Sequence, residues 1–281
     1  MKGAKDLVRI FTDNLRTCSV SAAKTVIRLF EQFLYPLKCL KCGIYIDTER
    51  VRPQTMDACF CDHCMSAGVY FIDPPFCIKC GVKFHQLKAS SGVNENHVCE
   101  TCLKTPLTVD RVRAVAEYKG IIKDAIPLFK YHSKLSMAKV FEDLLFQAFL
   151  RHYTGSGIDL IMPVPLHKKK LRERGFNQAF LLIRNFATYY QKKFGQTPLW
   201  KIDITSLIRI KKTQPQTGFD MEQRKNNLKD AFKVKDKKTI QNKHILLIDD
   251  VFTTGATCNE AAMELLKNGA EKVEALVLAR T

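Results

Sequence analysis

The sequence predicts an α/β protein with a mainly parallel sheet flanked by helices, and with a small cysteine-rich unit before it. Residues 160–164 and 245–248 are apolar without alternation, and residues 273–279 are apolar except for Glu274, as strands buried on both faces of a parallel sheet are. Segments with apolar residues at helical spacing lie between them, an order typical of an α/β fold. The cysteine-rich unit is indicated by ten of the eleven cysteines, which lie between Cys18 and Cys102.

The length and charge of the chain limit its class. Its 281 residues are enough for one sizeable core and a second, smaller unit. Lys and Arg number 45 against 28 Asp and Glu, and the net charge of +17 favours polyanionic partners such as nucleic acid, polyphosphate or acidic lipid. No apolar run is long enough for a transmembrane or secretory segment, so we expect a cytoplasmic protein.

Residues 1–38 are predicted to form an amphipathic helical segment. Apolar side chains such as Val26, Phe30 and Phe33 recur at helical spacing, and the helix is expected to end before Pro36. Such a basic segment can pack on the next domain, or it can contact a partner or a membrane surface. A peripheral location at the inner face of the membrane therefore stays open.

Residues 39–106 are predicted to form a double zinc ribbon. Four Cys-x2-Cys pairs occur in two repeats, each with an 18-residue spacer and each opening with Cys-x-Lys-Cys-Gly. Two cysteines in one turn supply two ligands, so two such pairs complete a tetrahedral four-thiolate zinc site. The eight ligands of two structural zinc ions would be Cys39, Cys42, Cys61, Cys64, Cys77, Cys80, Cys99 and Cys102.

Other uses of these cysteines stay open. A disulfide framework is disfavoured by the reducing cytosol that we expect for a chain without a secretory signal. Iron–sulfur ligation, redox-active thiols and an interleaved pairing of the two repeats also fit the number of thiols. A unit of about 65 residues with few apolar side chains needs a metal to fold, so we expect the zinc ions to be structural rather than catalytic.

Residues 107–281 are predicted to form the parallel-sheet domain. A strand at residues 111–118 precedes helices at residues 121–130 and 136–152. The strand at residues 160–164 then leads into a run of five basic residues around one acid: Lys168, Lys169, Lys170, Arg172 and Arg174 around Glu173. Such a run is typical of a solvated or nucleic-acid-binding face, and at the ligand edge of the sheet it can instead neutralise a diphosphate. Asn177 is expected to cap a helix that continues to Phe194.

Residues 245–257 carry the strongest chemical signal. The strand ends in two carboxylates, Asp249 and Asp250, which places them at the edge of a parallel sheet where ligands bind. A turn of small and hydroxyl residues then leads into a helix, for which Thr257 and Glu260 are expected to form a capping box. Backbone N–H groups, hydroxyls and the helix dipole favour an anion there, and the acids can accept hydrogen bonds from sugar hydroxyls or hold Mg²⁺. A sugar phosphate meets both requirements.

This segment resembles the loop of type I phosphoribosyltransferases that binds phosphoribosyl diphosphate (PRPP): four apolar residues, two acids, two variable residues and then Thr-Thr-Gly-x-Thr. The resemblance implies that Asp249 and Asp250 bind the 2′- and 3′-hydroxyls of ribose. It also implies that Mg²⁺ accompanies the ligand and that the 5′-phosphate is held by Thr253, Thr254, Gly255, Ala256 and Thr257.

Two further blocks narrow the resemblance to the ComF family of competence-associated proteins, which combine a double zinc ribbon with a type I phosphoribosyltransferase-like domain. The first block, residues 163–179, reads Pro-Val-Pro-Leu-His-x3-Leu-Arg-Glu-Arg-Gly-Phe-Asn-Gln-Ala. The second block, residues 207–232, begins with Leu-Ile-Arg and ends with Ala-Phe. The resemblance covers nearly the whole chain from Cys39.

The ComF resemblance implies further ligand contacts. Pro165 and His167 would belong to a diphosphate loop, and Lys168, Arg172 and Arg174 would approach the phosphates. The residues on or beside a loop that closes over the ligand would be Arg209, Thr213, Gln216 and Arg224. Lysines stand at positions 168 and 169 where the family usually has arginines, so the charge is kept but bidentate phosphate geometry is lost.

The function expected from the resemblance is phosphoribosyl chemistry linked to DNA uptake and natural transformation. An active enzyme would be a phosphoribosyltransferase, which transfers a pentosyl group while Mg²⁺ and basic residues stabilise the leaving diphosphate. No segment identifies a catalytic residue, a nucleophile or a base substrate. Two alternatives stay open: a non-catalytic factor that binds single-stranded DNA and keeps the pocket for regulation, and an adaptor for a transformation helicase.

Overall fold

The computed structural model of the chain describes residues 37–46, 55–84, 96–131, 136–212 and 228–281. The predictions for residues 1–36, and for Thr213, Gln216 and Arg224, lie outside the described residues. The chain divides into two compact units, Met1–Asp62 and His63–Thr281, and each is described by itself. The predicted domain boundaries, after residues 38 and 106, stay predictions.

The described part of the first unit is built from tight turns. Cys39 N donates to Ile44 O at 2.7 Å, and Gly43 N donates to Cys39 O at 2.9 Å. These two hydrogen bonds close the turn that contains the first cysteine pair. The short 3-10 helix η1 (Met56–Ala58) precedes the second pair. Helix α2 (Asp62–Met65) begins at the last residue of this unit.

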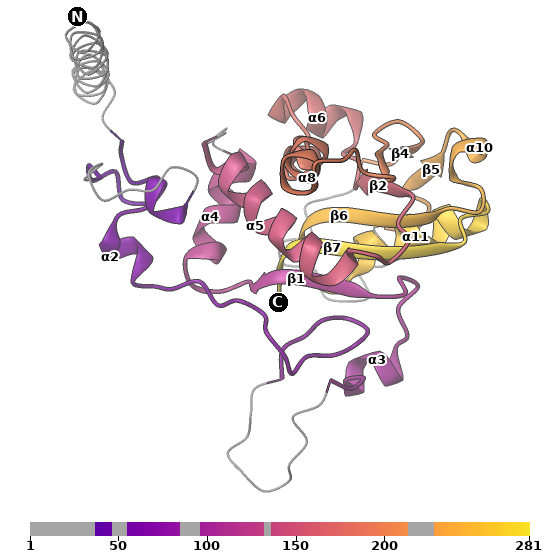
Figure 1. Cartoon of the computed structure of the whole chain (residues 1–281), viewed down its shortest axis with the longest axis horizontal. Coiled ribbons are helices and arrows are strands. Elements are labelled where there is room, and N and C mark those ends of the chain that lie inside the picture. The colour runs from indigo at the N-terminus through magenta and orange to yellow at the C-terminus, as the bar shows by residue number, and fades with distance from the viewer. Residues whose placement is uncertain (1–36, 47–54, 85–95, 132–135, 213–227) are drawn as a thin grey trace, which may run out of the picture. The chain divides into compact units, whose positions relative to one another are not determined.

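The second unit is organised around a five-stranded parallel sheet (Figure 1). The strand order is β1-β7-β6-β2-β3, and each neighbouring pair is parallel. The strands are β1 (Val112–Glu117), β2 (Leu160–Pro163), β3 (Lys201–Ile202), β6 (His244–Phe252) and β7 (Lys272–Arg280). The prediction of an α/β fold with a mainly parallel sheet is confirmed.

The central strand β6 is longer than its apolar run. Its ladder with β7 continues past the two acids to the partners Phe252 and Arg280, whereas the sequence indicated a strand that ends at the two acids. The reason is tertiary: β7 lies beside these residues and supplies hydrogen-bond partners that the local pattern does not reveal. Asp249 and Asp250 thus lie inside β6, close to its carboxyl end and to the carboxyl edge of the sheet.

Helices cover both faces of the sheet. Helix α5 (Ser136–Tyr153) packs on β1 and β7, and α7 (Gln178–Leu181) packs on β2 and β6. Helix α11 (Ala256–Lys267) packs with alternate residues of β6, Ile245 and Leu247, through its own Ala261 and Leu265. Helix α4 (Gly120–Tyr131) follows β1 and ends in a turn that contains Lys130.

Around α7 one local prediction is confirmed and another needs correction. Asn177 caps a helix as expected, since its Oδ1 accepts a hydrogen bond from Ala179 N at 3.0 Å. The helix nevertheless ends at Leu181, and a separate helix α8 (Phe186–Phe194) follows. The buried carboxylate of Glu142 on α5 accepts hydrogen bonds from the backbone N and from the Nδ2 of Asn185, which fixes the start of α8.

A two-stranded antiparallel hairpin stands apart from the main sheet. It consists of β4 (Leu207–Arg209) and β5 (Phe232–Val234), and the short helix α10 (Lys237–Ile240) follows it. Carboxylates of α11 hold it: Glu260 Oε1 accepts from Asp230 N at 2.6 Å and Glu264 Oε1 accepts from Val234 N at 2.9 Å. Among the described residues, none of the helices has the length and apolarity needed to cross a membrane.

Candidate functional site

The acid pair lies at the carboxyl end of β6 with a lysine against it. Asp250 is buried and Asp249 is partly buried. Asp250 N donates to Asp249 Oδ1 at 2.8 Å, which fixes the first carboxylate against the backbone of the second. Lys130 Nζ, from the last turn of α4, lies 2.8 Å from Asp250 Oδ2. The pair therefore carries its own cation.

Burial and the neighbouring charges shift the pKa values of the groups in this cluster. Burial, together with the negative charge of Asp250, raises the pKa of Asp249 to about 7. Burial alone would lower the pKa of Lys130, but the Asp250 carboxylate outweighs it and raises that pKa. Burial lowers the pKa of Arg209, against the attraction of Asp249. The acids can therefore accept hydrogen bonds from neutral hydroxyls without bringing a full double charge into the site.

The turn after β6 is shaped by one glycine. Gly255 has φ +77°, and a Cβ placed there would lie 2.4 Å from Cζ of Phe252. Helix α11 begins at Ala256 with Gly255 in the capping position, and Asn259 N donates to Gly255 O at 2.8 Å. The predicted cap at Thr257 is therefore wrong, because the left-handed glycine lets the helix begin earlier. Glu260 holds the β4–β5 hairpin instead of closing a capping box.

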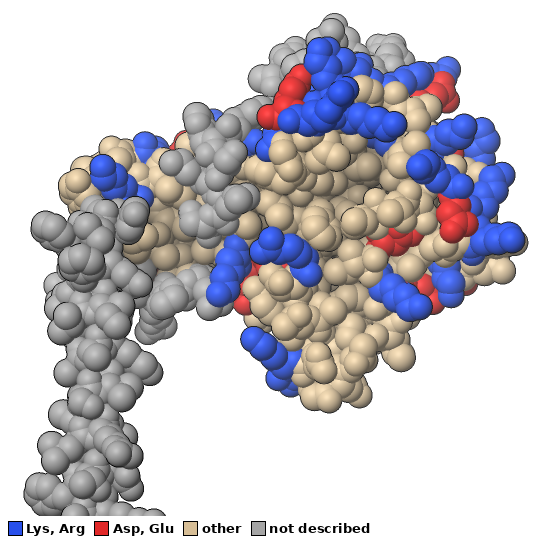
Figure 2. Space-filling view, turned by 90° about the horizontal axis from the view of Figure 1, so that it is seen from above, with Lys and Arg blue, Asp and Glu red and all other residues tan. Residues whose placement is uncertain are grey.

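The basic run forms a short helix beside the acid pair. His167 Nδ1 caps α6 (Lys168–Arg174) by accepting a hydrogen bond from Lys169 N at 3.2 Å. The backbone of His167 also forms an isolated parallel β-bridge with that of Arg209 in β4. Burial lowers the pKa of Lys170, and the nearby positive charges of Arg209 and Arg174 add to this effect. Several cations thus converge near the acid pair from three separate elements. Lys and Arg side chains also predominate over Asp and Glu on the face seen from above in Figure 2.

The structure brings some predicted residues together and leaves others apart. Asp249 interacts electrostatically with Arg209, and Arg174 interacts electrostatically with both Lys130 and Lys170. Lys168 and Arg172 are instead exposed on α6, and Pro165 is partly buried before it. Lys130 lies in a basic cluster with His132 and Lys134, for which the sequence favours a solvated basic face over a ligand contact. The structure instead places Lys130 against Asp250, and the other two residues lie outside the described residues.

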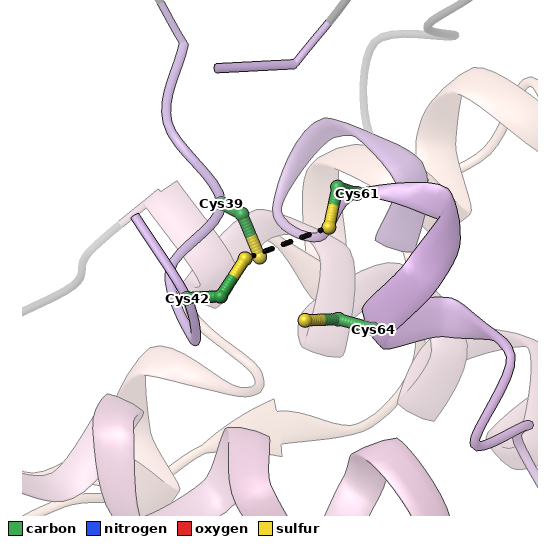
Figure 3. A group of neighbouring side chains, drawn as sticks. All are labelled: Cys39, Cys42, Cys61 and Cys64. Carbon is green, nitrogen blue, oxygen red and sulfur yellow. Dashed lines mark hydrogen bonds between the residues drawn. The ribbon is translucent and has the colours of Figure 1, made fainter. Parts of the chain in front are cut away.

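The eight predicted metal ligands form two groups of four thiols. In each repeat the four sulfurs lie within 4.8 Å of one another, and Figure 3 shows those of Cys39, Cys42, Cys61 and Cys64 directed toward a common centre. The second group is Cys77, Cys80, Cys99 and Cys102. The pairing is within each repeat rather than interleaved, and the ten described cysteines are free of disulfides.

The geometry of both groups fits zinc. The Sγ atoms of Cys42 and Cys61 are 3.6 Å apart and those of Cys80 and Cys99 are 3.7 Å apart. Metal–sulfur bonds of about 2.3 Å in a tetrahedron give sulfur separations of about 3.8 Å. Backbone N–H groups of Cys80 and Cys99 donate to Cys77 Sγ at 3.4 and 3.3 Å, as thiolate ligands require. Both groups could thus hold structural zinc, which would cross-link turns that have little apolar core.

Comparisons with known proteins agree with this architecture. Residues 187–281 match the family model described as the phosphoribosyl transferase domain. The DNA utilization protein YhgH of Escherichia coli K12 is 30% identical over 213 residues, which cover 74% of this chain and 86% of that protein. Competence protein F of Haemophilus influenzae is 28% identical over 73% of this chain and 85% of that protein. Competence protein ComFC of Bacillus subtilis is 28% identical over 66% and 72%.

Proposed function

The chain belongs to the ComF family of competence-related, phosphoribosyltransferase-like proteins, and on this basis we propose that it binds PRPP or a related phosphoribosyl compound with Mg²⁺. The ligand would lie at the carboxyl edge of the parallel sheet. We further propose that this binding serves DNA uptake and use during natural transformation, as the names of its relatives suggest.

One observation carries the ligand proposal: the acid pair, the left-handed turn and the cations of α4, α6 and β4 meet at one edge of one sheet. Asp249 and Asp250 would accept hydrogen bonds from the 2′- and 3′-hydroxyls of ribose. Backbone N–H groups and hydroxyls of Thr253, Thr254, Gly255, Ala256 and Thr257 would hold the 5′-phosphate at the start of α11. Each half of the site thus suits one half of the ligand.

The basic groups suit the diphosphate. Lys170 lies close enough to Arg174 and Arg209 for their positive charges to lower its pKa, and a bound diphosphate would add negative charge to that of Glu173 nearby. His167 and Pro165 lead directly into α6, and Thr213, Gln216 and Arg224 would complete the closing loop. If the protein is an enzyme, these groups would stabilise the negative charge that develops on the leaving diphosphate.

Mg²⁺ is proposed to enter with the ligand rather than at the bare acid pair. Lys130 already neutralises Asp250, and the raised pKa of Asp249 disfavours a second full charge. When bound, Mg²⁺ would supply further neutralisation of the diphosphate oxygens. The residues of this chain would then orient the ribose and exclude water.

The binding proposal can be tested by titrating Mg²⁺-PRPP calorimetrically into the full zinc-loaded chain. A matched variant, Asp249→Asn with Asp250→Asn, keeps the size of both side chains and removes their charges. We expect saturable heat with the wild type and a loss of at least about tenfold in affinity with the variant, because hydrogen bonds to charged acceptors are lost. Equal binding by both proteins, or none by a folded wild type, would refute the proposed site.

A second function, binding of single-stranded DNA, is favoured by the exposed part of α6. Lys168, Lys169 and Arg172 are exposed there, and the face in Figure 2 is rich in Lys and Arg. The net charge of +17 favours any polyanion, and phosphate contacts are the main source of sequence-independent affinity. An adaptor role toward a transformation helicase would use the same surface without ligand turnover.

Salt dependence separates this surface from the pocket. Fluorescence anisotropy with a labelled oligothymidylate should show affinity that falls as salt rises, with a slope reduced by about 2 when Lys168, Lys169 and Arg172 are changed to Ala. The acid-pair variant should bind the same DNA at least as well as the wild type. If the triple variant keeps the wild-type slope, α6 is not a DNA-binding surface.

A further inference from the structure

The second group of thiols is attached to β1, an outer strand of the parallel sheet whose strand β6 carries the acid pair. Lys79, between Cys77 and Cys80, accepts a hydrogen bond through its backbone O from Val112 N of β1 at 2.7 Å. Arg113 of β1 donates through Nη1 to Ile78 O at 3.1 Å. The turn that supplies two of the four thiols is therefore held by a strand of the main sheet.

Arg280, the last residue of β7, reaches the thiols themselves. Its Nη2 donates to Cys80 Sγ at 2.8 Å, and its Nε is buried with no hydrogen-bond partner in the described part of the chain. A guanidinium that is partly buried, as that of Arg280 is, is stabilised by a nearby anion. Four thiolates around a zinc ion carry a net negative charge, because their charge outweighs that of the dication. The zinc-loaded group is therefore a suitable counter-charge for Arg280.

The same side chain contacts the ring beneath the glycine turn. Arg280 and Phe252 are partners in the β6–β7 ladder, and the guanidinium lies 5.3 Å from the centre of the Phe252 ring. The Phe252 ring lies so close beneath Gly255 that there is no room for a Cβ. A short path of direct contacts thus runs from Cys80 through Arg280 and Phe252 to the turn before α11.

We propose that Arg280 is a positioning residue that couples the second four-thiol site to the turn at Thr253–Ala256. With zinc bound, the thiolates hold the guanidinium over Phe252, and the ring supports the turn from below. Loss of this zinc releases Arg280 and loosens the turn. Only the consequence for ligands rests on the proposed function: if the turn holds a phosphate, zinc at this site controls its affinity.

Two measurements on the ligand-free, zinc-loaded full chain test the coupling. Zinc release is followed with the chromogenic chelator 4-(2-pyridylazo)resorcinol, and amide hydrogen exchange of residues 252–257 is followed by mass spectrometry. Arg280→Met keeps much of the side-chain length and removes the charge and the N–H donors. We expect it to release one zinc equivalent, and to exchange the amides of the turn, roughly tenfold faster than the wild type.

Matched variants define the comparison. Arg280→Lys keeps the charge and should give smaller effects on both readouts, whereas Lys272→Met, at the other end of β7, should change neither. Because coupling between two sites is reciprocal, Gly255→Ala, which displaces the Phe252 ring, should also accelerate zinc release, while Gly195→Ala should not. If Arg280→Met does not fold, the comparison of zinc release between Gly255→Ala and Gly195→Ala tests the coupling instead.

The outcomes are distinct from those of the PRPP titration, because no phosphoribosyl ligand is used. Faster zinc release from Arg280→Met with unchanged exchange in the turn would overturn the coupling and leave a local zinc-site role. Unchanged zinc release would overturn the Arg280 contact as well. Parallel changes in zinc release and in the turn support the proposal even if the protein binds no PRPP.

Discussion

Replacing Gly255 with alanine should cost far more stability than the same change at another left-handed glycine. Alanine in the left-handed region costs about 1 to 2 kcal/mol. At Gly255 the new methyl would also lie 2.4 Å from Phe252 Cζ, 3.0 Å from its Cε2 and 3.1 Å from its Cε1. Overpacking of this kind costs about 1 to 3 kcal/mol. Together these effects should lower the free energy of unfolding by about 2 to 5 kcal/mol.

Gly195 is the matched control. It ends α8 with φ +71°, and a Cβ there would meet nothing within 4 Å, so Gly195→Ala should cost only the backbone term of about 1 to 2 kcal/mol. Urea unfolding can be followed through Trp200, the single tryptophan, which is buried near Phe149 and Tyr190. Equal losses for the two variants would refute the crowding of the turn. Phe252→Leu should rescue part of the loss in Gly255→Ala, because the two side chains are in contact.

Three further predictions concern charge and metal. The pKa of Asp249 is raised in the folded protein, so its protonated form stabilises the fold fully below about pH 4, and this contribution is lost as pH rises through about 7. Asp249→Asn should therefore gain stability relative to the wild type as pH rises over that range. The gain should be no more than about 4 kcal/mol by urea unfolding at pH 5 and pH 8, and a constant difference would contradict it. Without any phosphoribosyl ligand, Lys130→Met should bind Mn²⁺ at the acid pair roughly tenfold more tightly than the wild type, as measured by electron paramagnetic resonance. Lys123→Met, on the exposed side of α4, should leave the Mn²⁺ affinity unchanged. Atomic absorption should find two zinc ions per chain, and their removal by a chelator should lower the unfolding midpoint; iron, or an unchanged midpoint, would be evidence against structural zinc.

Features with a local cause could be predicted from the sequence. The apolar run Ile245–Ile248 needs no distant information to indicate a buried strand, and the two acids after it mark the ligand edge of a parallel sheet. The Cys-x2-Cys spacing likewise brings two thiols together within one turn, so the grouping of Cys77 with Cys80 follows from the chain alone.

Features that depend on contacts between distant segments could not be predicted. Lys130 and Asp250 come from different elements, and nothing in the composition near Lys130 distinguishes it from other basic segments. The extension of β6 to Phe252 depends on the register with β7, and the start of α11 depends on Gly255 rather than on the hydroxyl of Thr257. The contact between Arg280 and Cys80 joins residues from opposite ends of the second unit and has no sequence signal.

Recognition of the ribose hydroxyls by the acid pair can be tested by comparing two sugar phosphates. Ribose 5-phosphate and 2-deoxyribose 5-phosphate share the phosphate and differ by the 2′-hydroxyl. We predict that the wild type binds ribose 5-phosphate about tenfold more tightly, because the deoxy sugar leaves a carboxylate oxygen unpaired, and that Asp249→Asn with Asp250→Asn abolishes this preference. Equal affinity of the wild type for both sugars, measured by calorimetry, would show that the acid pair does not recognise the 2′-hydroxyl.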